Sequence, residues 1–294
     1  MIFSRLIFWL VIKPISLLPY GALYIYSDFF FLILFHLVGY RKKVVKANLR
    51  GCFPQKSEQE ITQLAKKFYR HFCDLVLESL KNFSITHEQA QERMTQEGLE
   101  VFEKLYQEGR SVILTGGHYC NWELWAVSTP PHFKHRLMGI YKRLSNKYFD
   151  EKMRTSRGKF GLELVSTKET GDFFKENIND LTVSVFAIDQ SPSNPKKAMW
   201  ITFFGRETAA LFGAEKYAKD YNYPVVYAHL SKKSRGKYHV RYELVTETPN
   251  ETEYGEITHK LHEILESDIR KAPEYWLWSH KRWKHKRPVE EKNA

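Results

Sequence analysis

Short apolar runs alternate with amphipathic segments along most of the chain. The runs that fit buried strands are Ser111–Thr115, Arg136–Tyr141, Leu181–Ile188 and Pro224–Leu230. The segments with helical spacing of apolar residues are Leu99–Gln107, Asn146–Arg157, Thr208–Lys219 and Thr252–Arg270. Strands that alternate with helices predict one α/β domain with a mixed, largely buried β-sheet flanked by helices.

Two further segments carry a clear local signature. Ser57–Glu60 reads SEQE, a capping box, and apolar residues follow it at helical spacing from Ile61 to Leu80. An amphipathic helix is therefore expected to begin there. Lys237–Thr246 alternates polar and apolar residues, which is typical of an antiparallel strand near the edge of a sheet.

The first 40 residues are crowded with Leu, Ile, Phe and Tyr and carry only three charges, at Arg5, Lys13 and Asp28. The apolar pattern is interrupted by Pro14, Pro19, Gly21, Asp28 and His36, and no uncharged run reaches the roughly 20 residues of a standard span. The pattern predicts a helical, membrane-anchoring segment over residues 1–40. A bilayer-crossing and an interfacial placement both fit, and a buried core hairpin is the alternative.

A basic segment follows the apolar one. Arg41–Arg50 carries five cations and no acid, as expected of a juxtamembrane segment on the cytoplasmic side of a membrane. The sequence thus divides into an anchor over residues 1–40 and a folded domain over 41–294. A cleaved signal peptide fits poorly, because the apolar pattern continues too far and no small-residue cleavage site follows it.

The charge and the cysteines narrow the class of protein. The chain has 45 Lys and Arg against 34 Asp and Glu, a net charge of +11, so its surface should attract nucleic acid, anionic lipid or acidic carrier proteins. The three cysteines, Cys52, Cys73 and Cys120, form no CxxC pair. This pattern argues against a disulfide framework and a zinc module, and it favours a reducing compartment.

The strongest candidate chemistry lies in GGHYCNWE, which directly follows the first apolar run. His118 and Glu123 are five residues apart, about 140° around a continuous helix, so they face each other only if a helix begins between them. Gly116 and Gly117 would permit a tight exit from the strand. His118 could then act as a general base, with Glu123 as the carboxylate that orients it.

This segment, and a pair of histidines further along the chain, also fit other chemistries. Cys120 could be a nucleophile, although a small buried thiol is the more common outcome. His259 and His262 are three residues apart on an expected helix, near Glu263 and Glu266, which is a weak metal-site pattern. An ordinary packed histidine would also explain His118.

The end of the chain interleaves aromatic and basic residues. Tyr275, Trp276, Trp278 and Trp283 alternate with Lys281, Arg282, Lys284, Lys286 and Arg287. This composition suits lipid phosphate at a membrane interface, stacked nucleic-acid bases, or aromatics packed in a core. The apolar beginning of the chain favours lipid over nucleic acid.

Five blocks in order support a resemblance. They are Lys46–Pro54 (KANLRGCFP), Gly116–Glu123 (GGHYCNWE), Tyr141–Asp150 with Arg157 downstream, Asp189–Gly205 (DQ and a later FFG), and Pro273–Pro288 (PEYWLWSHKRWKHKRP). Together they resemble the bacterial lipid A late acyltransferases, the lauroyl and myristoyl transferases within the HxxxxD/E lysophospholipid acyltransferase superfamily. The chain departs from the family at Lys142, where arginine is usual, and at Arg143, where proline is usual.

The resemblance implies an enzyme in which His118 removes a proton from an acceptor hydroxyl, which then attacks an acyl thioester, with Glu123 orienting the histidine. It implies substrate-binding roles for Asn146, Arg157, Asp189, Gln190 and Arg282, and no metal or other cofactor. The donor would be acyl carrier protein or acyl-CoA, and the acceptor an anionic glycolipid or phospholipid. No nucleic acid partner is expected.

The resemblance also implies a place in the cell and leaves alternatives. The enzyme would act on a lipid A precursor at the bacterial inner membrane, with its catalytic domain facing the cytoplasm. A lysophospholipid, aminolipid or glycolipid acceptor is the alternative within enzymes. A non-catalytic membrane-binding protein with the same fold is the alternative outside them.

Overall fold

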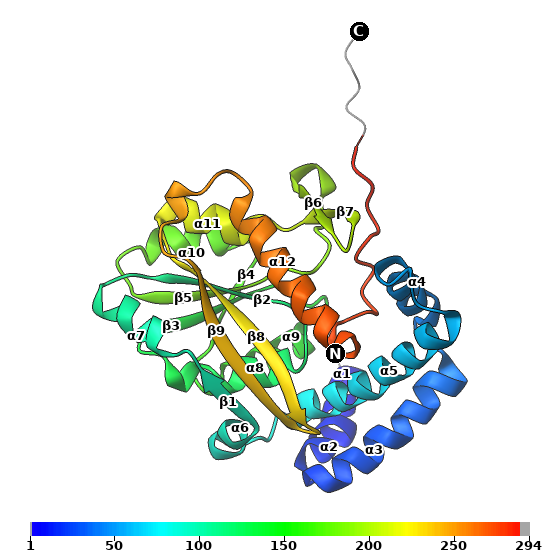
Figure 1. Ribbon diagram of the computed structural model, residues 1–294. Coiled ribbons are helices and arrows are strands. Elements are labelled where there is room, and N and C mark those ends of the chain that lie inside the picture. Colours follow the sequence, from blue (N-terminus) through cyan, green and yellow to red (C-terminus); the bar gives the residue numbers. More distant parts are fainter. Residues whose placement is uncertain (1, 289–294) are drawn as a thin grey trace.

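A seven-stranded sheet lies at the centre of the computed structural model, which describes residues 2–288 (Figure 1). Met1 and the last six residues of the predicted 41–294 domain fall outside the described part. The strand order is β1-β9-β8-β2-β5-β3-β4, and only the β8–β9 pair is antiparallel. The strands of this sheet are β1 Met94–Glu97, β2 Val112–Gly116, β3 Arg136–Tyr141, β4 Glu163–Ser166, β5 Thr182–Ala187, β8 Val225–Ser234 and β9 Lys237–Thr246.

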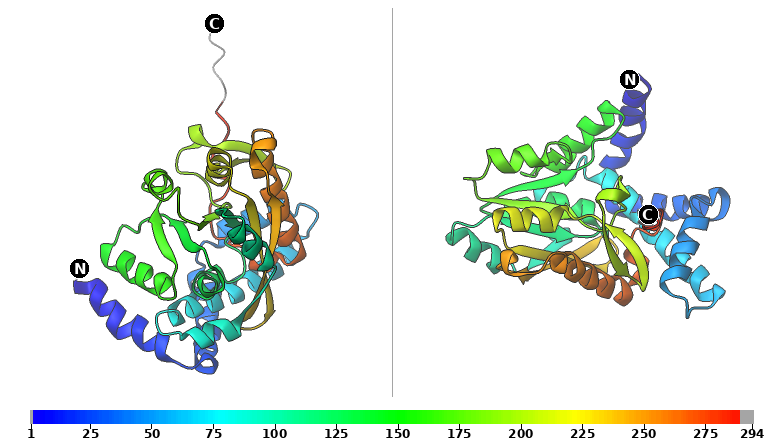
Figure 2. Two further views of the ribbon diagram at one scale, coloured as in Figure 1. Left: turned by 90° about the vertical axis from the view of Figure 1, so that its left-hand side faces the viewer. Right: turned by 90° about the horizontal axis from the view of Figure 1, so that it is seen from above.

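Helices flank the sheet on both sides (Figure 2). Those after the N-terminal segment are α4 Lys42–Cys52, α5 Glu58–Lys81, α6 His87–Arg93, α7 Glu100–Gln107, α8 Trp122–Ser128, α9 Lys147–Gly158, α10 Thr170–Glu176, α11 Gly213–Tyr221 and α12 Glu256–Lys271. Side chains of the central strands, such as Ile113, Leu114 and Val226, are fully buried. The predicted fold class, a mixed and largely buried sheet flanked by helices, is confirmed.

The structure confirms the two segments with a strong local signature. Ser57 caps α5, with its side chain and that of Glu60 bonded reciprocally to backbone amides. β9 has the predicted bounds and lies second from the sheet edge.

The helix predicted over Thr208–Lys219 is wrong in its first part. Arg206–Ala210 forms strand β7, which pairs in a separate antiparallel hairpin with β6, Met199–Phe203. Phe204 and Gly205 at the turn both have positive φ, and this tight turn commits the following residues to pairing before α11 begins at Gly213.

The N-terminal segment is helical and lies along one margin of the molecule, beside α5 (Figures 1 and 2). Its parts are α1 Ile2–Ile7, η1 Phe8–Ile12, α2 Lys13–Leu17, α3 Tyr20–Leu32 and η2 Ile33–Val38. The continuous helix Tyr20–Val38 is, by length and composition, able to cross a membrane.

Candidate active site

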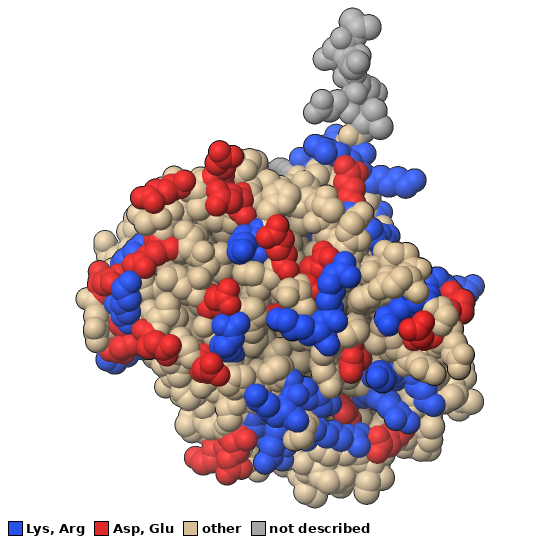
Figure 3. Space-filling view, in the orientation of Figure 1, with Lys and Arg blue, Asp and Glu red and all other residues tan. Residues whose placement is uncertain are grey.

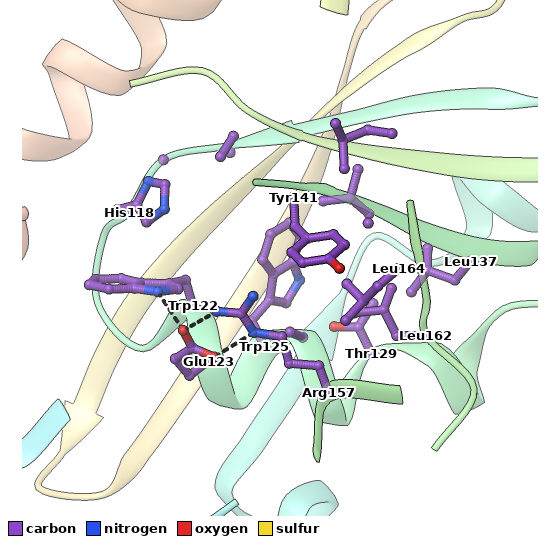
Figure 4. A pocket seen from close by; sticks show the side chains of 17 residues that line it. His118, Trp122, Glu123, Trp125, Thr129, Leu137, Tyr141, Arg157, Leu162 and Leu164 are labelled. Carbon is purple, nitrogen blue, oxygen red and sulfur yellow. Dashed lines mark hydrogen bonds and ion pairs between the residues drawn. The ribbon is translucent and has the colours of Figure 1, made fainter. Parts of the chain in front are cut away.

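The GGHYCNWE segment joins β2 to α8 at the carboxyl end of the sheet. β2 ends at Gly116, and α8 begins at Trp122, where the Asn121 side chain accepts a hydrogen bond from the Leu124 amide at 2.8 Å. The helix therefore begins between His118 and Glu123, as the spacing predicted. The first turn of α8 brings Glu123 to the same side of the sheet end as His118 (Figure 4).

Gly117 is required for close approach rather than for an unusual backbone angle. A Cβ added there would lie 2.8 Å from Leu265 Cδ1 and 3.6 Å from Asp189 Cγ. A side chain there would press against Leu265 of α12, whereas Asp189, which follows the neighbouring strand β5, would lie at an ordinary contact distance.

His118 is held by Asp189. The distance from His118 Nδ1 to Asp189 Oδ1 is 2.7 Å, and the His118 amide donates to Asp189 Oδ2 at 2.9 Å. Trp276 Nε1 donates to the same Oδ2 at 2.8 Å. An ionised carboxylate can only accept, so Nδ1 carries the proton and Nε2 of the neutral ring is a hydrogen-bond acceptor. The side-chain amide of Gln190 lies 3.2 Å from this Nε2 and can donate to it.

The hydrogen-bonded carboxylate partner of His118 is therefore Asp189, whereas the sequence reading gave that place to Glu123. Glu123 instead accepts two hydrogen bonds from Arg157, at 2.9 Å from Nε and 2.6 Å from Nη2 (Figure 4). This bidentate pair engages both Glu123 oxygens, and Oε1 also accepts from Trp122 Nε1 at 3.2 Å. Among residues 2–288, Glu123 makes no hydrogen bond to the imidazole.

The charges around His118 set its protonation. Burial alone would lower the pKa of His118, but the Asp189 carboxylate, with a smaller contribution from Glu123, raises it above its ordinary value. Burial opposes ionisation of Asp189, yet His118 and the Trp276 hydrogen bond hold the pKa of that carboxyl well below its usual range. The pair is thus arranged so that Asp189 keeps its charge and His118 takes up and releases the proton.

A narrow pocket extends from these polar groups into the apolar interior. His118, Glu123 and Arg157 line its polar end, and Leu137, Leu162, Leu164 and Val185 line its other end, with a volume of about 120 Å³ (Figure 4). Pockets for drug-sized ligands usually enclose about 300–1,000 Å³. A cavity this small and apolar suits a slender hydrocarbon chain.

The structure brings four of the predicted site residues together with His118 and leaves two outside. Asn146 caps α9 and donates to Ser4 Oγ at 2.8 Å, so its side chain is used in holding α9 against the N-terminal segment. Arg282 is 1% exposed and donates to the Ala209 carbonyl oxygen, in the interior beside the β6–β7 hairpin. The substrate contacts expected of these two side chains are not supported by their positions.

The alternative chemistries find no support in the geometry. Cys120 is fully buried, and burial raises the pKa of its thiol well above the ordinary value, which suits packing rather than nucleophilic attack. His262 is 2% exposed and bonded through Nδ1 to the Thr258 carbonyl oxygen, with its pKa lowered by burial to about 4.

The C-terminal aromatics belong largely to the core. Trp276 and Trp278 are 2% and 0% exposed, and their rings pack edge to face. The interfacial reading of these two residues is therefore wrong. No sequence pattern indicates that Trp276 holds Asp189, because only the fold brings the two residues together.

Comparisons with known proteins find relatives along nearly the whole chain. The family model described as bacterial lipid A biosynthesis acyltransferase matches residues 2–285. The chain is 24% identical over 286 residues to a lipid A biosynthesis acyltransferase of Haemophilus influenzae, covering 95% of this chain and 90% of the relative. It is 23% identical over 280 residues to a lipid A biosynthesis lauroyltransferase of Escherichia coli, covering 95% and 89%.

Proposed function

Because the chain belongs to the bacterial lipid A biosynthesis acyltransferase family, we propose that it transfers a fatty acyl chain from acyl carrier protein to a hydroxyl of a lipid A precursor. The acceptor would approach at the cytoplasmic face of the inner membrane. The observation that carries the proposal is His118 Nε2, held by Asp189 through the opposite ring nitrogen, at the mouth of a narrow apolar pocket.

The chemistry follows from these positions. His118 Nε2 removes the proton of the acceptor hydroxyl as its oxygen attacks the thioester carbonyl carbon. The tetrahedral intermediate then collapses, the carbon–sulfur bond breaks, and the protonated histidine returns the proton to the departing thiolate. The acyl chain of the donor would lie in the pocket lined by Leu137, Leu162 and Leu164.

Arg157 would stabilise the oxyanion. Its Nε and Nη2 are bonded to Glu123, whereas Nη1 makes no hydrogen bond within residues 2–288, and the side chain is 25% exposed at the polar end of the pocket. A fixed guanidinium with one free edge can donate to a developing negative charge. Glu123 would then act through Arg157, as the group that fixes its orientation.

The basic surface suits the proposed donor. Acyl carrier proteins are acidic, and the net charge of +11 would favour their approach. Lys142 stands where the family usually has arginine and can offer only a point charge to a phosphate.

The proposal is tested by lipid mass spectrometry of the host with and without this protein. Loss of the protein should leave a lipid A species lighter by one acyl chain. The purified enzyme, given acyl carrier protein thioester and the precursor, should restore that mass. Use of a lysophospholipid acceptor while the precursor is ignored would contradict the proposed acceptor.

The rate of acyl transfer is expected to rise with pH. Only the neutral form of His118 can accept a proton, and its pKa lies above the ordinary 6.5 because of Asp189. The rate should therefore be low in acid, rise through an apparent pKa above 6.5 and then level off. Measuring kcat/KM between about pH 5 and 9 tests this. A profile that falls over the same range would exclude His118 as the base.

Gly139→Ala is expected to shift the enzyme toward shorter acyl chains. A Cβ at Gly139 would lie 3.3 Å from Leu164 Cδ2 and 3.6 Å from Leu162, two of the leucines that line the pocket. A misfit of one methylene in an apolar pocket costs about tenfold or more in kcat/KM. The measurement is competition between acyl carrier protein thioesters of increasing length.

Gly171→Ala is the matched control for that substitution. Gly171 lies in helix α10, outside the pocket. A Cβ added there would make only an ordinary contact with the Tyr217 hydroxyl, 3.6 Å away. Its chain-length profile should stay unchanged. An unaltered profile in Gly139→Ala as well would place the acyl chain elsewhere.

A further inference from the structure

The N-terminal helix α3 has two unlike faces. Ile25, Phe29 and Leu32 are 72%, 62% and 53% exposed, which is unusual for large apolar side chains. On the opposite face, Leu23 and Ser27 are 0% and 1% exposed against the domain. The outer face therefore presents a continuous apolar strip, which suits the acyl region of a membrane.

The inner face of α3 is tied to the domain by polar bonds. Tyr24 donates to Glu78 at 2.9 Å, and Ser27 donates to Asp74 at 2.7 Å. Asp28 pairs with Arg235 at 2.7 Å. Arg235 lies at the turn that joins β8 to β9, so the end of this hairpin is fixed against the middle of α3.

The bonds between α3 and the domain restrict the orientation that α3 can take in a membrane. The 19 residues from Tyr20 to Val38 span about 28 Å, close to the thickness of the hydrocarbon core. If the helix crossed the bilayer with its contacts intact, Asp28, Arg235 and the neighbouring lysines of the hairpin would lie near the midplane. Charged side chains are strongly unfavourable there. The helix must therefore lie along the membrane surface, with its outer face in the lipid.

A cationic cleft opens beside α3 in the same place. This open cleft has a volume of about 620 Å³ and lies between α3, α5 and the hairpin end. Figure 3 shows Lys and Arg side chains gathered over the end of the β8–β9 hairpin and the adjoining helices. The cationic residues that line the cleft are Arg70, Lys232, Lys233 and Arg235, against the carboxylates of Asp28 and Asp74.

Two of these cations can bind an added anion without breaking a salt bridge, although the Arg70 guanidinium lies over the Phe31 ring, 5.2 Å from its centroid. Arg235 and Lys232 pair with Asp74, at 2.6 and 3.5 Å. Arg70 and Lys233 make no salt bridge with any carboxylate of residues 2–288, and both are exposed. Leu32 lines the cleft and also belongs to the outer strip of α3, so the cleft adjoins the surface proposed to face lipid.

We propose that this cleft binds the phosphate group of an anionic membrane phospholipid, with α3 lying flat along the membrane surface. Arg70 and Lys233 contact the phosphate, and the acyl chains of the lipid pack against Leu32. The site is separate from the pocket at His118. Its tests measure binding and depth, so they can fail independently of the proposed acyl transfer.

The first test is co-flotation of the full-length protein with vesicles of phosphatidylcholine, with and without phosphatidylglycerol. The double variant Arg70→Gln/Lys233→Gln should lose about tenfold or more of the affinity that phosphatidylglycerol adds. The matched control is Lys175→Gln/Lys260→Gln, which removes two exposed lysines of α10 and α12. Its net charge is therefore the same as that of the Arg70→Gln/Lys233→Gln variant. Equal losses in both double variants would overturn the site, because only the total charge would then matter.

A second arm separates a lipid headgroup from free phosphate. Inorganic phosphate at the ionic strength of a matched chloride buffer should not displace the protein from phosphatidylglycerol vesicles. Displacement by phosphate, absent in chloride and absent in the Arg70→Gln/Lys233→Gln variant, would show a site for the free anion and overturn the lipid assignment.

The orientation of α3 is tested by the depth of nitroxide labels at Phe29→Cys and Leu37→Cys. The three native cysteines are buried, so the unsubstituted protein is the control for labelling. A flat helix places both labels at similar depth, about 5–10 Å into the boundary. A crossing helix would place residue 29 near the midplane and residue 37 near the surface, and that result would overturn the proposal.

Discussion

Alanine in place of His118 is expected to reduce acyl transfer about a thousandfold while the protein stays folded. The imidazole is the group at the pocket mouth whose Nε2 can accept a proton from a hydroxyl. Without the imidazole, no base takes the proton from the attacking hydroxyl. No acid then protonates the departing thiolate. The pocket and Arg157 remain, so a residual rate above the uncatalysed one should persist.

The measurement is the transfer rate from acyl carrier protein thioester to the lipid A precursor, together with the thermal unfolding temperature. His239→Ala is the matched control, because His239 is also bonded to a carboxylate, Glu97, but lies on β9 away from the pocket. It should keep nearly full activity. Retention of most activity by His118→Ala would contradict the proposed mechanism.

The fold could be predicted well where a segment decides its own structure. The strands at Arg136–Tyr141 and Lys237–Thr246 have the bounds that their patterns indicated. Strands β1 and β4 are not predicted from the sequence, because four residues each are too few to show an alternation of polar and apolar positions. The failure over Thr208–Lys219 has a different cause, since pairing with β6 overrides the weak helical spacing of that segment.

The site was predictable only in its local part. The helix start between His118 and Glu123 follows from residues that are adjacent in sequence. The partner of His118 depends on β2 lying beside β5, and strand order cannot be read from an apolar pattern. From the sequence alone, Asp189 is therefore expected to contact substrate and Trp276 to lie at an interface, although in the structure both hold the histidine.

Asp189→Asn should provide the sharpest test of that holding role. Asp189 Oδ2 accepts from the His118 amide and from Trp276 Nε1, while Oδ1 accepts from His118 Nδ1. An asparagine has one acceptor oxygen, which will face the two donors, so its NH₂ group will face Nδ1. Nδ1 must then become the acceptor, and the proton moves to Nε2. The base is lost without any change in the shape of the site.

The expected result is a fall in kcat of about a thousandfold or more, comparable to the loss that follows when a catalytic histidine is held in the wrong tautomer. The residual activity should rise at lower pH than in the unsubstituted protein, because the carboxylate that raises the pKa of His118 is gone. A purely structural role would not move the pH profile. Asp172→Asn, an exposed carboxylate on α10, is the control and should leave rate and profile unchanged. Normal kcat in Asp189→Asn would show that another group orients His118, and Glu123 would return as the candidate.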